Sequence, residues 1–300
     1  MTTPSTKQKL QTVLYQLFVF TFLFTFPLIS NAKNVIIFPQ PQSSSDASHT
    51  YYINLIKLAL DKSNKSDDYT ITISKNPLTQ GRTFIELAKK NGLINIYQSG
   101  TTQARENKFI AIKIPLLKGT LGYRINLIHK DNINKFNNIA SLADLSKLSA
   151  CQGTHWPDSD ILEAAGLRVI RNASYENMFL QVKNKHCDYF PRAIIEAYSE
   201  EKARQDPDIV VHDKLVISYQ FPMYFFISPH QKQLATDIKT GLNIAVEDGS
   251  FDDLFQNNNI TKSLFPLSKW RQSLILNLNN PFLPKNTPTD DKRLWVSLQP

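Results

Sequence analysis

Strand and helix periodicities alternate along this chain from residue 34 to about residue 257, and this alternation restricts the fold more than any other feature. Val35 to Phe38 forms a short apolar run that predicts a strand. The apolar residues that follow recur at the spacing of one helix face: Tyr52, Leu55, Ile56, Ala59 and Leu60. Strands that alternate with helices of this length indicate parallel sheets with covered faces, so we expect an α/β fold.

The same periodicity predicts two successive α/β units. In the first unit the expected strands are Val35 to Phe38, Tyr69 to Ile73, Leu93 to Tyr97, Phe109 to Ile114 and Leu121 to Ile128. In the second unit they are a strand ending at Cys151, Leu167 to Ile170, Asp188 to Phe190 and Ile209 to Val211. Two further strands and two helices follow: Lys214 to Tyr219, Met223 to Ile227, Gln233 to Glu247 and a short helix from Ser250. From Asn258 on, we expect a helical stretch around Trp270 and a Pro- and Asp-rich tail.

The N-terminus has the pattern of a targeting segment. Lys7 and Lys9 precede an apolar run from Val13 to Ile29, which ends in the small residues of Ser30-Asn31-Ala32. This pattern predicts a secretory signal peptide, residues 1–32, cleaved after Ala32, and therefore a periplasmic protein. The uncharged stretch 10–32 is also long enough to span a bilayer, so an uncleaved membrane anchor is the alternative.

Charge and cysteine content bear on the kind of partner and on the state of the two cysteines. The net charge is +8, but Lys and Arg are scattered without a basic run that could follow a phosphate backbone, so we expect no nucleic-acid partner. Cys151 and Cys187 would meet an oxidising compartment after export. They could form one disulfide or remain two buried free thiols.

Most enzyme motifs are missing from the sequence. The nine Gly residues form neither a Gly-rich phosphate loop nor a nucleophile elbow, and the six His residues show no metal-ligand spacing. We therefore expect no cofactor, no metal and no catalytic activity, although a triad assembled in space from distant residues is still possible.

Arg192, in the stretch HCDYFPRAIIEAY, is a candidate for ligand contact. Asp188 to Phe190 is predicted as a strand, Pro191 as the turn after it, and Ala193 to Tyr198 as a helix. Arg192 would then lie where a strand is followed by a helix, which is where ligands bind in open α/β sheets. The alternative is an ordinary ion pair with Glu196, four residues further on.

Several segments occur in an order that resembles a known family. They are GTTQAR from Gly100, PLLKGTLGYRINLIHK from Pro115, SLADL from Ser141, CQGTHWPDSDIL from Cys151, CDYFPRAIIEAY from Cys187, YQFPMYFFIS from Tyr219 and DGSFDDLF from Asp248. Over residues 34–257 the sequence thereby resembles the extracytoplasmic solute-binding proteins of family 3, with the type II periplasmic-binding fold.

The resemblance implies two lobes, each with a mainly parallel sheet flanked by helices, that trap a small ligand between them. Residues 33–118 and 221–300 would form lobe 1, and residues 119–220 lobe 2. The resemblance also implies a periplasmic, monomeric protein that delivers its ligand to an inner-membrane transporter, or reports it to a sensor kinase or cyclase.

The resemblance also implies positions for the ligand. Arg105 matches the arginine that clamps a ligand carboxylate, and the loop Gln152, Gly153, Thr154 and His155 matches the loop that holds the ligand before a helix. The aspartate that usually holds an α-amino group falls near Ala193, beside Arg192. With no carboxylate nearby until Glu196, we expect nothing here that balances an ammonium group, which favours an anionic or polyhydroxylated ligand. Trp156 and either Tyr51 or Tyr52 are the expected aromatic walls.

An enzyme on the same fold is the second hypothesis. A dehydratase or hydrolase acting on a small organic acid could use Asp158, Asp160, Glu163 and His155 around one loop. Acidic residues at a helix start are more commonly caps, so binding without turnover is the preferred expectation.

Overall fold

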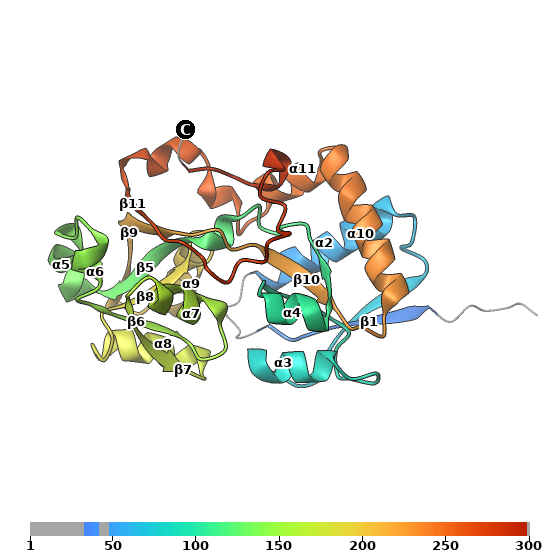
Figure 1. Ribbon diagram of the computed structural model, residues 1–300, viewed down its shortest axis with the longest axis horizontal. Helices are drawn as coiled ribbons and strands as arrows, with labels where there is room; N and C mark the ends of the chain where they lie inside the picture. The colour runs from blue at the N-terminus through green and yellow to red at the C-terminus, as the bar shows by residue number, and fades with distance from the viewer. Residues whose placement is uncertain (1–32, 42–47, 299–300) are drawn as a thin grey trace, which may run out of the picture. The chain divides into compact units, whose positions relative to one another are not determined.

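The computed structural model describes residues 33–41 and 48–298 (Figure 1). The predicted signal peptide, residues 1–32, lies outside the described residues, as does its predicted cleavage after Ala32. Within the described ranges, none of the helices combines the length and the apolar character that a membrane crossing requires. From Val35 on, the chain forms one compact unit.

The first group of strands includes the antiparallel sheet β3-β10-β4. Asn95 joins the two-stranded sheet β1-β2 to its edge, since Asn95 N donates to Ile37 O at 3.1 Å and Asn95 Oδ1 accepts from Ile37 N at 2.8 Å. The mainly parallel sheet expected here is not found, because β10 returns from the far part of the chain and inserts between β3 and β4. The strands are β1 (Asn34–Phe38), β2 (Tyr69–Ile73), β3 (Ile96–Gly100), β4 (Ile110–Ile112) and β10 (Met223–Ile227).

The second sheet is mixed and has six strands in the order β11-β9-β5-β8-β6-β7. β11 runs parallel to β9, and β6 runs parallel to both β7 and β8, whereas β5 is antiparallel to β8 and β9. The strands are β5 (Tyr123–His129), β6 (Ser149–Gly153), β7 (Arg168–Asn172), β8 (Tyr189–Ala193), β9 (Ile209–Ser218) and β11 (Leu274–Asn277). The predicted α/β fold class is confirmed.

Helices flank both groups of strands (Figure 1). Two helices that flank the first group of strands, α10 and α2, approach each other closely at Gly241 of α10. A Cβ atom there would lie 1.7 Å from Ala59 O of α2, so only glycine fits. The helices that flank this group are α2 (His49–Lys62), α3 (Gln80–Leu87), α4 (Gln103–Lys108), α10 (Lys232–Glu247) and α11 (Ser250–Asn257). The second sheet carries α5 (Ile133–Asn137), α6 (Leu142–Leu145), α7 (Pro157–Ala164), α8 (Tyr175–Lys183) and α9 (Ala197–Arg204).

The end of β8 differs from the sequence prediction. The strand was expected to stop at Phe190, but it continues to Ala193, and α9 begins only at Ala197. The reason is pairing with β5, which places Ile125 opposite Arg192 and Arg124 opposite Ala193. Arg192 therefore lies within a strand and not at a helix start.

Two other elements were not anticipated. β9 is one strand from Ile209 to Ser218, where two separate strands were expected. β11 adds Leu274–Asn277 to the six-stranded sheet, although a Pro- and Asp-rich tail after a helical stretch was expected in this region. The predicted partition into lobe 1 (33–118 and 221–300) and lobe 2 (119–220) stays a prediction. It assigned residues 274–277 to lobe 1, whereas these residues form β11 in the six-stranded sheet.

The C-terminal tail binds both segments that connect the two sheets. The chain crosses between β4 and β5, where Lys118 O accepts from Val296 N at 2.8 Å. It crosses back between β9 and β10, where Gln220 O accepts from Asn280 Nδ2 at 2.8 Å. Gly119 has φ +76°, and a Cβ atom there would lie 2.3 Å from the Trp295 ring. The tail is thus packed directly onto the connecting segments.

Cys151 and Cys187 form a disulfide, with their Cα atoms 5.7 Å apart, which is within the usual range for such a bond. Cys151 belongs to β6, and Cys187 lies just before β8, the strand that pairs with β6. Of the two alternatives that the sequence left open, the disulfide is the one observed.

Candidate ligand-binding cleft

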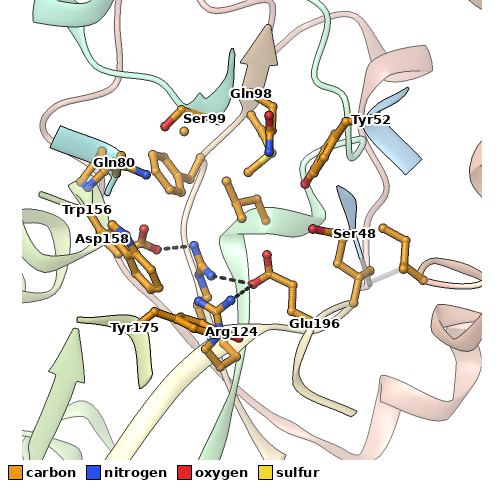
Figure 2. A pocket seen from close by; sticks show the side chains of 18 of the residues that line it. Ser48, Tyr52, Gln80, Gln98, Ser99, Arg124, Trp156, Asp158, Tyr175 and Glu196 are labelled. Atoms are coloured by element: carbon orange, nitrogen blue, oxygen red, sulfur yellow. Dashed lines mark hydrogen bonds and ion pairs between the residues drawn. The ribbon is translucent and has the colours of Figure 1, made fainter. Parts of the chain in front are cut away.

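A cavity of about 80 Å³ lies between the strands of the first group and the six-stranded sheet (Figure 2). One water molecule requires roughly 10–15 Å³ of such space, so the cavity has room for several waters or one small solute. Figure 2 shows Gln98, Ser99 and Tyr52 on one side and Arg124 with Asp158 on the other. The first three come from β3 and α2, and the last two come from β5 and α7.

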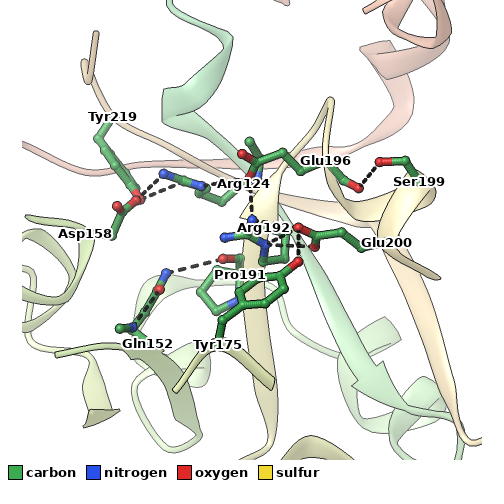
Figure 3. Close-up of polar contacts among 12 residues, drawn as sticks. Arg124, Gln152, Asp158, Tyr175, Pro191, Arg192, Glu196, Ser199, Glu200 and Tyr219 are labelled. Carbon is green, nitrogen blue, oxygen red and sulfur yellow. Dashed lines mark hydrogen bonds and ion pairs between the residues drawn. The ribbon is translucent and has the colours of Figure 1, made fainter. Parts of the chain in front are cut away.

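Arg124, Asp158 and Tyr219 form one buried polar cluster at this cavity (Figure 3). Arg124 Nη2 donates to Asp158 Oδ1, Arg124 Nε donates to Tyr219 Oη at 3.1 Å, and Tyr219 Oη donates to Asp158 Oδ1 at 2.5 Å. Burial would lower the pKa of Arg124, but the carboxylate of Asp158 raises it above its usual value. Arg124 is thus held as a cation, although only 2% of the residue is exposed.

Arg192 forms a second buried cluster with two carboxylates (Figure 3). Its Nη2 lies 2.7 Å from Glu200 Oε1 and 2.9 Å from Glu196 Oε2, and its Nε lies 2.8 Å from Glu200 Oε2. Tyr175 Oη donates to Glu200 Oε1 at 2.7 Å. Burial would lower the pKa of Arg192, but the charges of Glu196 and Glu200 raise it well above its usual value. The two clusters meet at Glu196, whose Oε2 lies 3.9 Å from Arg124 Nη1.

These pairs correct one expectation from the sequence. We expected no carboxylate that could balance an ammonium group near Arg192, yet Glu196 lines the cavity beside it. The ion pair between Arg192 and Glu196 is present, but Arg192 also lines the cavity, so its contact with a ligand stays a prediction. The sequence contained the pattern, because Glu196 and Glu200 follow Arg192 at intervals of four residues, but the prediction weighed only the first of them.

Some hydrogen-bonding capacity at the cavity is unused. Gln98 Oε1 is a buried acceptor with no partner in the part of the chain that the structure describes. The guanidinium groups of Arg124 and Arg192 each have one nitrogen, Nη1, to which the described residues provide no hydrogen bond. A buried acceptor without a partner is costly, so these atoms mark where a polar ligand would be stabilised.

Arg105 lies outside the lining of this cavity. Its guanidinium donates to Ser99 Oγ at 2.9 Å, to Gly100 O at 2.6 Å, to Gln80 Oε1 at 2.8 Å and to His155 O at 3.0 Å. Burial lowers the pKa of Arg105 to about 10. Ser99 and Gly100 line the cavity, so Arg105 holds two lining residues in place through its hydrogen bonds to them. Its contact with a ligand carboxylate stays a prediction.

The residues selected at the end of β6 and in the loop after it lie in different places, and not all of them line this cavity. Trp156 lines the cavity, as does Tyr52, whereas the Tyr51 hydroxyl is buried in the core and donates to Leu116 O at 2.6 Å. Gln152 is buried and donates to Pro191 O at 3.2 Å. Gly153, Thr154 and His155 line a second cavity on the other side of Trp156.

The acidic residues proposed for catalysis are separated. Asp158 lines the cavity, but Arg171 Nη2 holds Asp160 and Glu163 at 2.6 Å each, away from the lining. Residues 33–41 and 48–298 contain no group of three His, Cys, Asp or Glu side chains that could hold a metal ion. Arg124 and Tyr219 were not selected from the sequence, although one arginine within the apolar crossing strand of Pro115 to Lys130 was a usable indication.

Comparison with known proteins establishes the fold. No protein-family model and no curated protein matches the chain. An ancestral arginine-binding protein bound to arginine aligns with a TM-score of 0.55 and 14% identity, over 76% of this chain and 99% of that chain. A structure described in connection with glutathione import via GshT and the cystine ABC importer TcyBC of Streptococcus mutans aligns with a TM-score of 0.56 and 14% identity. The alignment covers 76% of this chain and 95% of that chain.

A third structure is AncCDT-1, described as an ancestral amino acid-binding protein and a precursor of cyclohexadienyl dehydratase. It aligns with a TM-score of 0.52 and 17% identity, over 75% of this chain and 95% of that chain. At these identities the alignments show a shared fold. The two-lobed type II periplasmic-binding fold is therefore confirmed.

Proposed function

We propose that this protein is a solute-binding protein that traps a small zwitterionic amino acid in the cavity between its two sheets and delivers it to a membrane importer. The observation that carries the proposal is the presence of both charges at one small cavity. Arg124 pairs with Asp158, and Arg192 pairs with Glu196, so cationic and anionic groups lie together in the lining.

Charge balance favours a zwitterion over an anion. Among the described lining residues, two guanidinium groups face three carboxylates, those of Asp158, Glu196 and Glu200, which gives a formal charge of −1. An anionic ligand would add a second uncompensated negative charge in a desolvated site, whereas a zwitterion adds none. The expectation of an anionic or polyhydroxylated ligand rested on Ala193 at the position of the family's aspartate and is replaced here.

The unused atoms suggest how an amino acid would be oriented. Its carboxylate would accept from Nη1 of Arg124 and of Arg192, because charged hydrogen bonds to arginine are the strongest available there. Its ammonium would donate to Gln98 Oε1, with the carboxylates of Asp158 and Glu196 nearby. The neighbour bound to arginine is consistent with an amino acid as the ligand class.

Export is part of the proposal. The disulfide between Cys151 and Cys187 suits an oxidising compartment, and the predicted signal peptide would lead there. We propose a periplasmic monomer that works with an inner-membrane importer. A sensor kinase or cyclase would be the partner if the bound protein transmits a signal instead.

The enzyme alternative has weaker support. Of the four candidate acids and bases, Asp158 is the described residue that lines the cavity, and Arg124 and Tyr219 both bind it. Asp158 Oδ1 is thus already engaged by two side chains of the protein itself, in a structural cluster. AncCDT-1 is described as the precursor of an enzyme, so turnover of any bound ligand should be measured directly.

The test is a calorimetric titration with the standard amino acids, with succinate as the organic anion and with glucose as the sugar. The Gln98→Leu variant should weaken amino-acid binding roughly tenfold to a hundredfold, the range for a hydrogen bond to a charged group. Gln103→Leu is the matched control, because Gln103 lies in α4 and bonds only to exposed Asn107 among the described residues. Binding of succinate or glucose, without binding of any amino acid, would refute the proposal.

A further inference from the structure

A second cavity, of about 510 Å³, lies directly beside the first one. It opens between the segment before α3, which contains Leu78 and Thr79, and two loops of the six-stranded sheet. One loop follows β6 and contains His155 and Trp156, and the other leads from β7 into α8 and reaches Met178. This cavity is therefore formed by residues from both sides of the cleft, as the first cavity is.

The lining of the second cavity differs in chemistry from that of the first. Leu78, Trp156, Tyr175 and Met178 provide apolar surface to it. Among the described lining residues, Glu176 is the one carboxylate, and it is half exposed and bound by Arg204 at 2.8 Å. No buried charge of the described lining faces this space, so it suits a neutral and mainly apolar group.

The two cavities share three lining residues, Gln80, Trp156 and Tyr175. Figure 2 shows these three along one edge of the first cavity. Trp156 is fixed against Phe190, with ring centroids 6.1 Å apart, and Tyr175 is fixed by its hydrogen bond to Glu200.

Gln80 is the more movable part of this shared wall. Among the described residues its side chain has one hydrogen-bond partner, since its Oε1 accepts from Arg105 Nη2 at 2.8 Å. A rotamer change at Gln80 breaks this one hydrogen bond, whereas Trp156 is packed against Phe190 and Tyr175 is bound to Glu200. Of the three shared residues, Gln80 is therefore the one that a group reaching from the first cavity into the second would displace.

We infer that the second cavity is a side-chain subsite, and that the ligand is an α-amino acid with a neutral apolar side chain such as that of methionine, leucine or phenylalanine. The inference rests on the proposed function, because the charged groups of the ligand must be held in the first cavity. The side chain then extends past Gln80 and Trp156 and packs against Leu78 and Met178.

The test compares L-methionine, L-phenylalanine and L-alanine by calorimetry on three variants and the wild type. Wild type should bind methionine and phenylalanine at least about tenfold more tightly than alanine, because each extra buried methylene adds affinity. Leu78→Glu should remove this advantage and leave alanine affinity unchanged. Ile85→Glu is the matched control, since Ile85 is 52% exposed on α3 and is not part of the lining.

Thr79→Trp is a second variant, which fills the cavity from an exposed position and requires no buried charge. It should weaken phenylalanine binding by about tenfold or more and leave alanine binding unchanged. Equal affinities for alanine, methionine and phenylalanine, or no effect of Leu78→Glu and Thr79→Trp, would overturn the subsite while the proposed function stands. If none of the standard amino acids binds wild type, the proposed function fails, and the subsite fails with it.

Discussion

Replacing Arg192 by Met should destabilise the ligand-free protein strongly. Arg192 is 6% exposed and makes three hydrogen bonds to Glu200 and an ion pair with Glu196. Arg192→Met leaves Glu200 without its cation and removes from Glu196 the nearer of its two arginines. Removing one partner of a buried ion pair costs roughly 3–5 kcal/mol. For a chain of this size that corresponds to a fall in Tm of about 6–20 °C.

Urea unfolding followed by circular dichroism measures this loss directly. The double variant Arg192→Met with Glu200→Gln should recover part of the stability, because the Glu200 carboxylate, which loses its cation, becomes a neutral amide that Tyr175 can still contact. Arg293→Met is the matched control, since Arg293 pairs with Asp291 while 61% of its side chain is exposed, and an exposed pair contributes about 0–1 kcal/mol. A loss below about 1 kcal/mol in Arg192→Met, or no recovery in the double variant, would refute a stabilising buried pair.

Three other perturbations have expected outcomes. Gly119→Ala should lower the free energy of unfolding by roughly 1–3 kcal/mol in urea titration, because φ +76° disfavours alanine and the new methyl group meets the Trp295 ring; an unchanged midpoint would contradict this. Reduction of the bond between Cys151 and Cys187, 36 residues apart, should cost roughly 4 kcal/mol by the loop-entropy relation, measured by unfolding with and without reductant. Burial lowers the pKa of His212 below its usual 6.5, so as the pH falls the unfolded chain binds a proton at His212 before the folded chain does. The free energy of unfolding should therefore fall as the pH drops below about 6.5. His212→Gln should lose less of this free energy between about pH 7.5 and 5.5 than wild type does.

Local pattern was sufficient for many of the elements. Tyr69–Ile73 and Met223–Ile227 have the predicted bounds, and the face of α8 that contains Met178, Phe179 and Val182 is buried as expected. These segments could be predicted locally, because a continuous apolar run or the regular spacing of apolar residues indicates a buried strand or a buried helix face.

The predictions failed where distant segments decide the structure. β8 extends through Pro191 and Arg192 because β5 pairs with it, and β11 exists because Leu274–Asn277 pairs with β9. Neither pairing leaves a trace in the local sequence of one partner. The same limit explains the candidate site. Trp156 and Tyr52, selected from the sequence as aromatic walls, line the cavity, and their contact with a ligand stays a prediction, whereas Arg124 was missed. Its role depends on Asp158 and Tyr219, which lie far from it in the sequence.

Native mass spectrometry of the freshly purified protein tests the central claim most directly, because it weighs whatever molecule the cleft retains. We expect a single adduct with the mass of one amino acid with an apolar side chain, which is weakened in Gln98→Leu and retained in Gln103→Leu. An adduct with the mass of a dicarboxylic acid or a sugar, or one that Gln98→Leu leaves unchanged, would contradict it.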